Sequence, residues 1–259
     1  MEKTGRQGGR QPRPRPQALR LTITPLTDPA PTALNYQPPG GLPPLVFLDE
    51  HLAVACKPSG LLSVPGRLPQ HRDSAFVRLQ AELGPLWVVH RLDMDTSGLI
   101  AFARSREAAA HLGRQFERRT VAKRYEARVW GQPPSDEGVI DLPLRLDWPH
   151  RPRQLVDARL GKPSLTRYAC LERQALSSRL LLLPVTGRSH QLRVHLSAIG
   201  LPILGDRFYG LEAVDSASPS EAPVALLHPA DRLMLHARDL SLQHPAQGQA
   251  LHWSVPAEF

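Results

Sequence analysis

Two short apolar runs separated by a polar loop constrain the fold of this chain more than any other feature. Leu86–Val89 leads into the loop and Leu99–Ala103 leads out of it. Apolar runs of this length, bounded by polar residues, are typical of buried β-strands. The chain is therefore expected to fold around a strand–loop–strand unit. The loop contains Asp93, which a rigid scaffold would leave open to a ligand, and Gly98, which gives the backbone freedom to turn.

The hydrophobic pattern of the whole chain predicts more strands than helices. Strands are predicted at 45–48, 52–56, 86–89, 99–103, 124–130, 180–185, 234–237 and 240–242. Helices are predicted at 74–83, 104–119 and 189–199. Because the two kinds of element do not alternate regularly, we expect an α+β domain with a mixed, mainly antiparallel sheet flanked by helices and loops. This domain is expected to span residues 45–259.

Residues 1–44 differ in composition from the rest of the chain. They contain ten of the 27 prolines, and in the first 16 residues five Lys and Arg stand against one Glu. Such a segment buries little apolar surface, so we predict a flexible basic extension. It either touches the phosphates of a nucleic acid through its cations or is a spacer. The Ser- and Pro-rich stretch 215–223 is predicted to be a surface loop.

The chain is basic, with 32 Lys and Arg against 24 Asp and Glu and a net charge of +8. This balance favours a polyanionic partner, of which nucleic acid is the commonest, although a basic protein without such a partner would look the same. No apolar stretch approaches the roughly 18 residues of a membrane span. The N-terminus also lacks the apolar core of a signal peptide. We therefore expect a cytoplasmic protein with no membrane partner.

Asp93 is the first candidate for chemistry. A positioned carboxylate can act as nucleophile or base without a cofactor, although an aspartate in a loop is more often a turn or capping residue. His90, Arg91 and Thr96 stand close to it in the sequence and are candidate substrate contacts. Asp95 completes an Asp-x-Asp pair, which by itself could suggest a metal site.

A second candidate site lies where an expected strand ends at Gly187 and a helix begins. Arg188 stands at this junction, and an arginine can hold a carboxylate through two hydrogen bonds. The alternative is an arginine that binds phosphate or faces solvent. Arg193 is a further candidate RNA contact. His190 and His195 stand five residues apart on the expected helix and point in different directions, which argues against a metal site.

Two further segments carry candidate substrate contacts. Tyr125 lies on an expected strand, where an aromatic side chain is more often part of the core than of a site, and Lys123 would lie near phosphates. Lys57 and Arg67 flank two turns that contain Pro and Gly. Both are candidate phosphate contacts, although a plain surface turn would explain them equally well.

The run His-Arg-Leu-Asp-x-x-Thr-Ser-Gly-Leu at 90–99 resembles the core motif of the RluA-type pseudouridine synthases. The likeness continues in order from about Leu45 to the C-terminus. It includes Lys-Pro-Ser-Gly-Leu at 57–61, Gly-Arg-Ser-His-Gln-Leu-Arg at 187–193, and the segment 200–210, which we interpret as mainly structural.

The resemblance implies roles for three residues. Asp93 falls on the catalytic aspartate of the family, and Arg188 is the arginine that the resemblance pairs with it. Tyr125 would stack on the target base, a contact worth on the order of 1–3 kcal/mol, and move a proton. The resemblance implies isomerisation of uridine to pseudouridine without a metal or other cofactor, so we interpret Asp95 as exposed or adjacent to RNA and not as a metal ligand.

Segment 142–152 resembles the branch of the family that modifies both 23S rRNA and tRNA. The expected function is therefore isomerisation of specific uridines in structured RNA, in 23S rRNA, in the anticodon stem-loop of tRNA, or in both. A monomer without an S4 domain and without a DNA partner is implied. One alternative is a nucleoside or glycoside hydrolase, which would need a second carboxylate. The other is a non-catalytic RNA-binding protein that retains the synthase fold.

Overall fold

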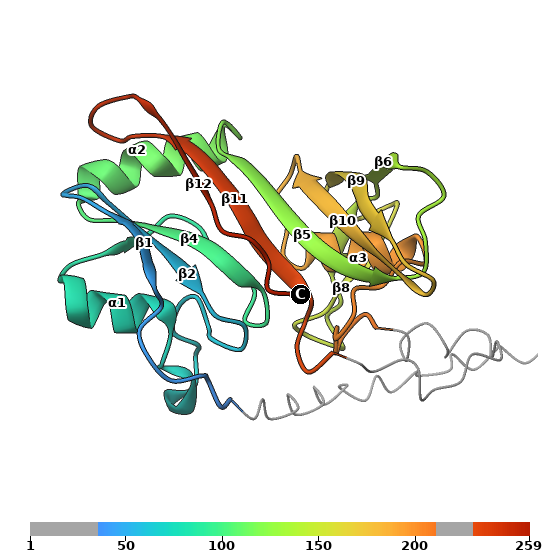
Figure 1. The fold of residues 1–259 in the computed structure, drawn as a ribbon. Helices are drawn as coiled ribbons and strands as arrows, with labels where there is room; N and C mark the ends of the chain where they lie inside the picture. Colours follow the sequence, from blue (N-terminus) through green and yellow to red (C-terminus); the bar gives the residue numbers. More distant parts are fainter. Residues whose placement is uncertain (1–35, 211–229) are drawn as a thin grey trace, which may run out of the picture.

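A ten-stranded sheet runs through the part of the chain that the computed structural model describes, residues 36–210 and 230–259 (Figure 1). The described residues form twelve strands, of which all but β7 and β8 belong to this sheet. They are β1 Leu45–Leu48, β2 Leu52–Lys57, β3 Trp87–Val88, β4 Ser97–Ala103, β5 Ala122–Trp130, β6 Glu137–Asp141, β7 Leu144–Leu146, β8 Gln154–Val156, β9 Leu165–Arg173, β10 Ser177–Pro184, β11 Leu235–Gln243 and β12 Ala250–Ser254. The helices are α1 Ala75–Leu83, α2 Arg106–Glu117 and α3 Gln191–Ala198, with a 3-10 turn at Pro69–His71.

The sheet is mainly antiparallel, and the α+β prediction is confirmed. Its order is β1-β2-β4-β11-β5-β10-β9-β6, with β3 beside β4 and β12 beside β11. Only β4 and β11 pair in parallel among the described strands, through His236 opposite Ser97 and Ala237 opposite Gly98. Strands β7 and β8 form a separate hairpin, which lies near α3 (Figure 1).

The three predicted helices are confirmed, and two of them begin at serine caps. The Ser74 side chain accepts a hydrogen bond from the backbone N–H of Val77 at the start of α1. Ser105 accepts one from Ala108 at the start of α2. Such caps satisfy backbone donors that the first helical turn leaves unpaired. Helix α3 has no side-chain cap, and its N-cap His190 adopts a left-handed conformation with φ 53°.

The sequence pattern predicted two late strands where the structure has one. Residues 234–237 and 240–242 belong to the single strand β11, which is interrupted by an irregularity in register between Ala237 and Asp239. A bulge shifts the side-chain alternation by one residue and so hides the continuity of a strand. Strands β6 to β9 and β12 were not predicted. In β9, Thr166 occupies a fully buried position, which breaks the apolar pattern.

The two larger helices cover opposite faces of the same strands. Leu79 of α1 packs with Ile100 of β4, whereas Leu112 of α2 packs with Leu99 of β4. Successive strand residues point to opposite faces, so a strand that is apolar throughout is buried on both sides. Helix α3 packs against the β5–β10 half of the sheet through Leu196.

One face of the sheet is covered by α1 over one half and by α3 over the other, and Tyr125 lies at the boundary between these halves, here called the seam. It packs against the cluster that contains α1 and against the cluster that contains α3. The loop between β3 and β4, which contains Asp93, reaches this seam. Gly98 makes the parallel pairing of β4 and β11 possible, because a Cβ there would lie 2.3 Å from the Ala237 carbonyl oxygen, and its φ is +109°.

Part of the segment that was predicted to be flexible packs against the domain. The Tyr36 hydroxyl donates to the Asp73 carbonyl at 2.9 Å and accepts from the Leu62 N–H at 3.0 Å. The Arg78 guanidinium donates to the carbonyls of Pro39 and Gly41. The domain therefore includes residues before the predicted boundary at 45. The rest of the predicted extension, residues 1–35, and the predicted loop 215–223 lie outside the described residues.

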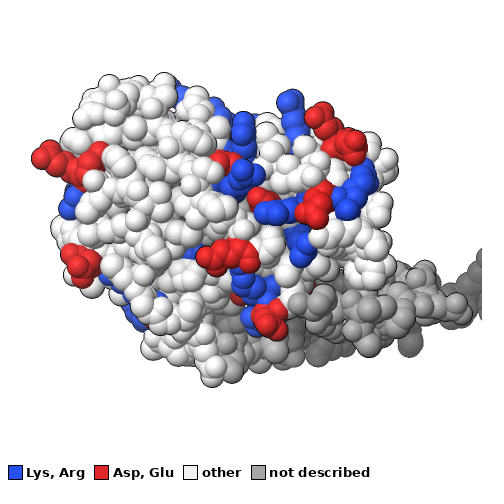
Figure 2. All heavy atoms as spheres, in the orientation of Figure 1, with Lys and Arg blue, Asp and Glu red and all other residues white. Residues whose placement is uncertain are grey.

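Acidic and basic side chains are interspersed over the right half of the surface in the orientation of Figure 1 (Figure 2). Several arginines of the sheet strands are paired with acids. Buried Glu126 binds Arg179 and, at 3.5 Å, Arg238, and Arg173 lies 2.7 Å from Asp136. These basic side chains are thus largely neutralised by neighbours. No helix in the described part of the chain is long and apolar enough to cross a membrane.

Candidate active site

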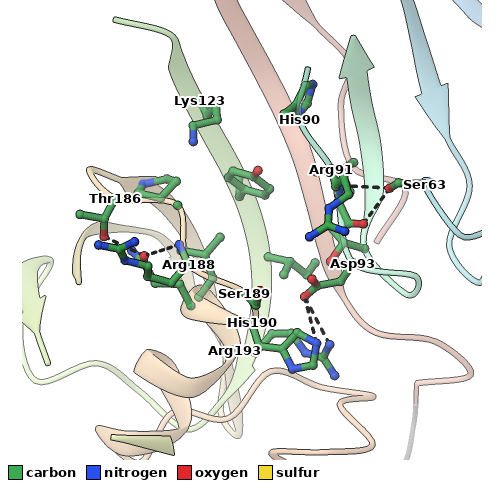
Figure 3. A pocket seen from close by; sticks show the side chains of 18 of the residues that line it. Ser63, His90, Arg91, Asp93, Lys123, Thr186, Arg188, Ser189, His190 and Arg193 are labelled. Carbon is green, nitrogen blue, oxygen red and sulfur yellow. Dashed lines mark hydrogen bonds and ion pairs between the residues drawn. The ribbon is translucent and has the colours of Figure 1, made fainter. Parts of the chain in front are cut away.

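A cavity of about 1360 Å³ opens at the seam of the sheet (Figure 3). Its walls come from the β3–β4 loop, the start of β5, the turn between β10 and α3, and the end of the β7–β8 loop. Pockets for single small molecules have volumes of roughly 300–1,000 Å³. This cavity is large enough for a nucleotide together with part of its neighbours.

The cavity wall is strongly basic. Among the described residues, nine of its lining side chains are Lys or Arg and three are Asp or Glu. Arg91, Arg124 and Arg188 are exposed there, so their charges face solvent and any bound polyanion. Clefts lined by one sign of charge concentrate ligands of the opposite sign. The wall therefore favours a phosphate-rich ligand around the few acidic groups inside.

Asp93 faces a buried arginine at the centre of the cavity. The Arg193 Nη1 atom lies 3.4 Å from Asp93 Oδ2 (Figure 3). The Arg193 side chain is 2% exposed and also binds Asp206 through two hydrogen bonds of 2.8 Å. Burial would lower the pKa of Arg193, but its hydrogen bonds to Asp206 and the charges of Asp206 and Asp93 raise it. A permanent cation with a fixed direction therefore faces the half-buried Asp93 carboxylate.

The prediction that Arg188 pairs with Asp93 is wrong. Arg188 is exposed on the cavity wall, and its backbone N–H donates to the Gln191 side chain at 3.1 Å. Arg193, which was predicted to bind substrate, holds the carboxylate. The physical reason is helical geometry, because Arg188 lies in the turn before α3 whereas Arg193 lies on the helix face that points at the β3–β4 loop.

His190 joins the same cluster from its strained position at the start of α3. A left-handed conformation is uncommon for residues other than Gly. Here it directs the imidazole so that Nε2 lies 3.9 Å from Asp93 Oδ2 and Nδ1 lies 2.7 Å from the Tyr209 hydroxyl. Burial lowers the pKa of His190, and the nearby Asp93 charge only partly opposes this. The imidazole is therefore neutral at neutral pH.

Tyr125 and Lys123 come to the cavity from β5, as expected for alternate residues of one strand. Burial raises the pKa of the Tyr125 hydroxyl, and the Asp93 charge raises it further. Burial also lowers the pKa of Lys123. The Tyr125 hydroxyl is thus protonated at neutral pH. The Tyr125 ring forms an apolar part of the cavity wall near Asp93.

Lys57 is not a phosphate contact, so that prediction is wrong. Its side chain is fully buried, and its ammonium group donates to the carbonyls of Pro58, Leu61 and Met94 at 2.9, 2.7 and 2.8 Å. These three hydrogen bonds use all three donors of an ammonium group. Lys57 therefore ties the 58–61 turn to the residue that follows Asp93, and its part in the site is structural.

The other predicted loop contacts fall into different environments. His90 and Thr96 line the cavity, but Thr96 is 2% exposed, and the His90 imidazole stacks on Phe116. Asp95, predicted to be exposed or adjacent to RNA, is 7% exposed and lies 3.8 Å from Arg207, so it is not exposed, although it lines the cavity. Arg67 is exposed, and it is not among the residues that line this cavity.

His90 holds the backbone of β4, and this makes a testable difference to acid stability. Its Nε2 atom accepts from the Ala101 N–H at 2.9 Å, and burial lowers the pKa of His90 to about 3. Between about pH 6.5 and 3 the unfolded chain binds a proton there that the folded chain does not, so the free energy of unfolding falls as the pH falls.

A His90→Gln variant is expected to keep an acceptor near this position without titrating. Urea unfolding measured from pH 7 to pH 4 should show a slope that is shallower than that of the native protein by up to about 1.4 kcal/mol per pH unit. Equal slopes for the two proteins would show that folding does not lower the pKa of His90.

Two residues of the cluster were missed by the sequence analysis. Asp206 accepts both hydrogen bonds of Arg193 and also, through Oδ1, those of the Phe208 and Tyr209 N–H groups. Tyr209 contacts His190 through its hydroxyl. Both belong to segment 200–210, interpreted above as mainly structural. The Gly-Asp pair before an aromatic run was the available signal. No group of three or more His, Cys, Asp or Glu in the described chain is arranged to hold a metal.

Comparisons with known proteins show the family of the chain. The family model for RNA pseudouridylate synthase matches residues 51–198. The dual-specificity RNA pseudouridine synthase RluA of Escherichia coli K12 is 50% identical over 228 residues, which cover 87% of this chain and 98% of that protein. The RluA of Vibrio vulnificus is 47% identical over 232 residues, or 87% of this chain and 88% of that protein.

A solved structure supports the fold. Human RNA Pseudouridylate Synthase Domain Containing 1 superposes with a TM-score of 0.68 at 28% identity, covering 86% of this chain and 87% of that chain. The family-model match includes the whole Asp93 loop and all of α3, which together supply the acid–arginine pair of the cavity. The chain therefore belongs to the RNA pseudouridylate synthase family, and it is an isomerase that converts uridine in RNA to pseudouridine.

Proposed function

We propose that Asp93 starts this isomerisation on a uridine that has left its stack and entered the cavity. The observation that carries the proposal is the Asp93 carboxylate, which is 26% exposed inside a basic cavity of about 1360 Å³ and faces Arg193 at 3.4 Å. Enzymes that act on a base in structured RNA must first extrude it. Cationic walls that grip the flanking phosphates hold the RNA while one base is turned inward.

The reaction is an isomerisation, so its atoms balance within one nucleotide. The C1′–N1 bond breaks, the uracil turns, a C1′–C5 bond forms, C5 loses its proton and N1 gains one. A single carboxylate can begin this by attack on the ribose, by attack on the base, or by removal of a ribose proton. Arg193 aims Asp93 in each case and offsets the change in its charge.

Tyr125 is proposed to stack on the target base. Its ring lies on the cavity wall, and base–aromatic stacking is worth on the order of 1–3 kcal/mol. Because burial and the Asp93 charge raise the pKa of its hydroxyl, Tyr125 is a proton donor at neutral pH. The C5 proton must therefore be taken by another group. Tyr125 could accept it only after its hydroxyl had first given its own proton to another acceptor.

The proposed substrates are structured RNAs of two kinds, a 23S rRNA stem-loop and the anticodon stem-loop of tRNA. The support is the name of the relatives, dual-specificity RNA pseudouridine synthases, which match this chain over 87% of its length. We also propose that the protein acts as a cytoplasmic monomer without a DNA partner.

The substrate assignment is tested by mapping. Purified protein is incubated with each unmodified transcript, and pseudouridine is located by carbodiimide labelling and primer extension. A new stop in both RNAs supports two substrates, and a stop in only one contradicts dual specificity. An Asp93→Asn control identifies stops that depend on this site.

Hydrolysis of the glycosidic bond is disfavoured by the acids around Asp93. A glycosidase needs a second carboxylate that is free to act across the bond. Asp206 has both oxygens bound to Arg193, and Asp95 is buried beside Arg207. Release of free uracil by the native protein would support the hydrolase alternative.

Arg188 is proposed to contact a phosphate, and the salt dependence of RNA binding tests this. An Arg188→Gln variant is expected to bind a substrate RNA several-fold more weakly at 100 mM salt. The slope of log K against log salt should also become shallower by about 0.7–0.9, the loss of one phosphate contact. Exposed Arg106, outside the cavity, supplies the control Arg106→Gln. An unchanged slope for Arg188→Gln would contradict the contact.

A further inference from the structure

Trp148 stands out on the surface beside the cavity. It is 62% exposed, whereas every other Phe, Trp and Tyr of the described residues is buried or partly buried. Single exposed apolar residues are common and need no explanation by themselves. Trp148 differs because it lies in the β7–β8 loop, the same loop whose Arg151 and Pro152 line the cavity.

The indole already carries a cation on its ring. The Arg151 guanidinium carbon lies 4.8 Å from the centre of the Trp148 ring. Arginine over an indole is a favourable contact, and it places a positive charge beside the flat ring. The pair therefore combines a flat apolar surface with a positive charge, which are the two features that single-stranded nucleic acid recognises.

The loop is held in place relative to the active site. Within it, the Asp147 N–H donates to the Arg153 carbonyl at 2.9 Å, and the His150 N–H donates to the Asp147 carbonyl at 3.1 Å. At its end, the Gln154 N–H donates to the Tyr209 hydroxyl at 2.7 Å. That hydroxyl also contacts His190, the neighbour of Asp93.

The base of the hairpin also packs on α3. Leu144 of β7 is buried in a cluster with Val194 of α3 and with Tyr209. Trp148 is thus presented at a fixed place on the rim, and it is not on a loose connection. A fixed aromatic platform orders a ligand at a smaller entropic cost than a mobile one.

We propose that Trp148 and Arg151 form a stacking platform for an unpaired base that flanks the target uridine in the substrate RNA. The target base enters the cavity beside Asp93, and the strand leaving it passes the rim, where a neighbouring base lies on the Trp148 indole next to the positive charge of Arg151. Stacking accepts any base, so the platform selects an open loop over a closed duplex. The inference rests on RNA as the substrate class and not on which RNA is modified.

The first test compares steady-state kinetics on an RNA that the native protein is seen to convert. Trp148→Ala is expected to raise KM about tenfold and to change kcat less than twofold, because the platform binds RNA outside the reacting atoms. Trp148→Phe should restore most of the native KM. Leu160→Ala is the matched control, since Leu160 is 75% exposed and does not line the cavity. Thermal unfolding checks that each variant is folded.

The second test identifies the stacked base. Single abasic nucleotides are placed in turn through the loop of the same RNA. At one position the native protein should lose about tenfold in affinity, whereas Trp148→Ala should lose nothing more. Trp fluorescence should be quenched on binding of intact RNA, and much less so in Trp148→Phe. A native KM for a folded Trp148→Ala would overturn the platform. So would a Trp148→Ala variant that weakens binding of the intact RNA and of every abasic RNA by the same factor.

Discussion

An Asp93→Asn variant is expected to bind substrate RNA nearly as tightly as the native protein while its turnover falls on the order of 10²–10⁴-fold or more. The amide has nearly the same shape as the carboxylate but can act neither as a strong nucleophile nor as a base. It also loses the charge that faces Arg193 at 3.4 Å. Turnover is measured by chromatography of nucleosides after digestion of the RNA, and affinity by filter binding.

The control for this variant is Asp136→Asn. Asp136 is 84% exposed, is paired with Arg173 and does not line the cavity. It therefore undergoes the same chemical change on the surface and should keep native turnover. Substantial turnover by a pure Asp93→Asn preparation would show that another group starts the reaction. A parallel loss of RNA affinity would mean that Asp93 serves binding more than chemistry.

Removing Asp206 is expected to have the second large effect, on stability as well as on activity. In Asp206→Ala the Arg193 guanidinium, which is 2% exposed, loses both of its 2.8 Å hydrogen bonds. Leaving a buried charge without its partner typically costs about 3–5 kcal/mol of the free energy of unfolding. Turnover should also fall, because Arg193 is no longer held toward Asp93. Urea unfolding and single-turnover kinetics measure the two effects.

A double variant separates structure from catalysis at this pair. Replacing a buried ion pair by apolar residues of similar volume is often neutral for stability. Arg193→Met with Asp206→Leu is therefore expected to recover much of the stability lost in Asp206→Ala, but not the turnover. Recovery of both would show that the pair only supports the fold, and that Arg193 has no part in the reaction.

The sequence was sufficient to predict those helices and strands whose apolar pattern is continuous. Strand β4 is buried at every position, and the helices α1 and α2 begin at serines with apolar residues in helical spacing behind them. The pattern failed where tertiary contacts replace apolar burial. Thr166 of β9 is buried because its hydroxyl meets the side chains of Gln191 and His195 on α3. No local signal in the sequence predicts such partners.

The candidate site shows the same division. Position in the motif was enough to predict that Asp93 and Tyr125 lie together, and both line the cavity, but it could not tell which arginine meets the carboxylate. Arg188 and Arg193 are five residues apart, and the left-handed turn at His190 decides which of them points inward. Lys57 was mistaken for a surface cation because burial of a lysine depends on three carbonyls brought together by folding.

The measurement that tests the central claim most directly is release of tritium from RNA labelled at C5 of uridine, followed under single turnover. The C5 hydrogen must leave when C5 bonds to the ribose, so the native protein is predicted to release one tritium for each pseudouridine formed, with no free uracil. Asp93→Asn, bound to the same RNA, is predicted to release essentially none. Tritium release by Asp93→Asn at the native rate would contradict the assignment of Asp93 as the residue that starts the reaction.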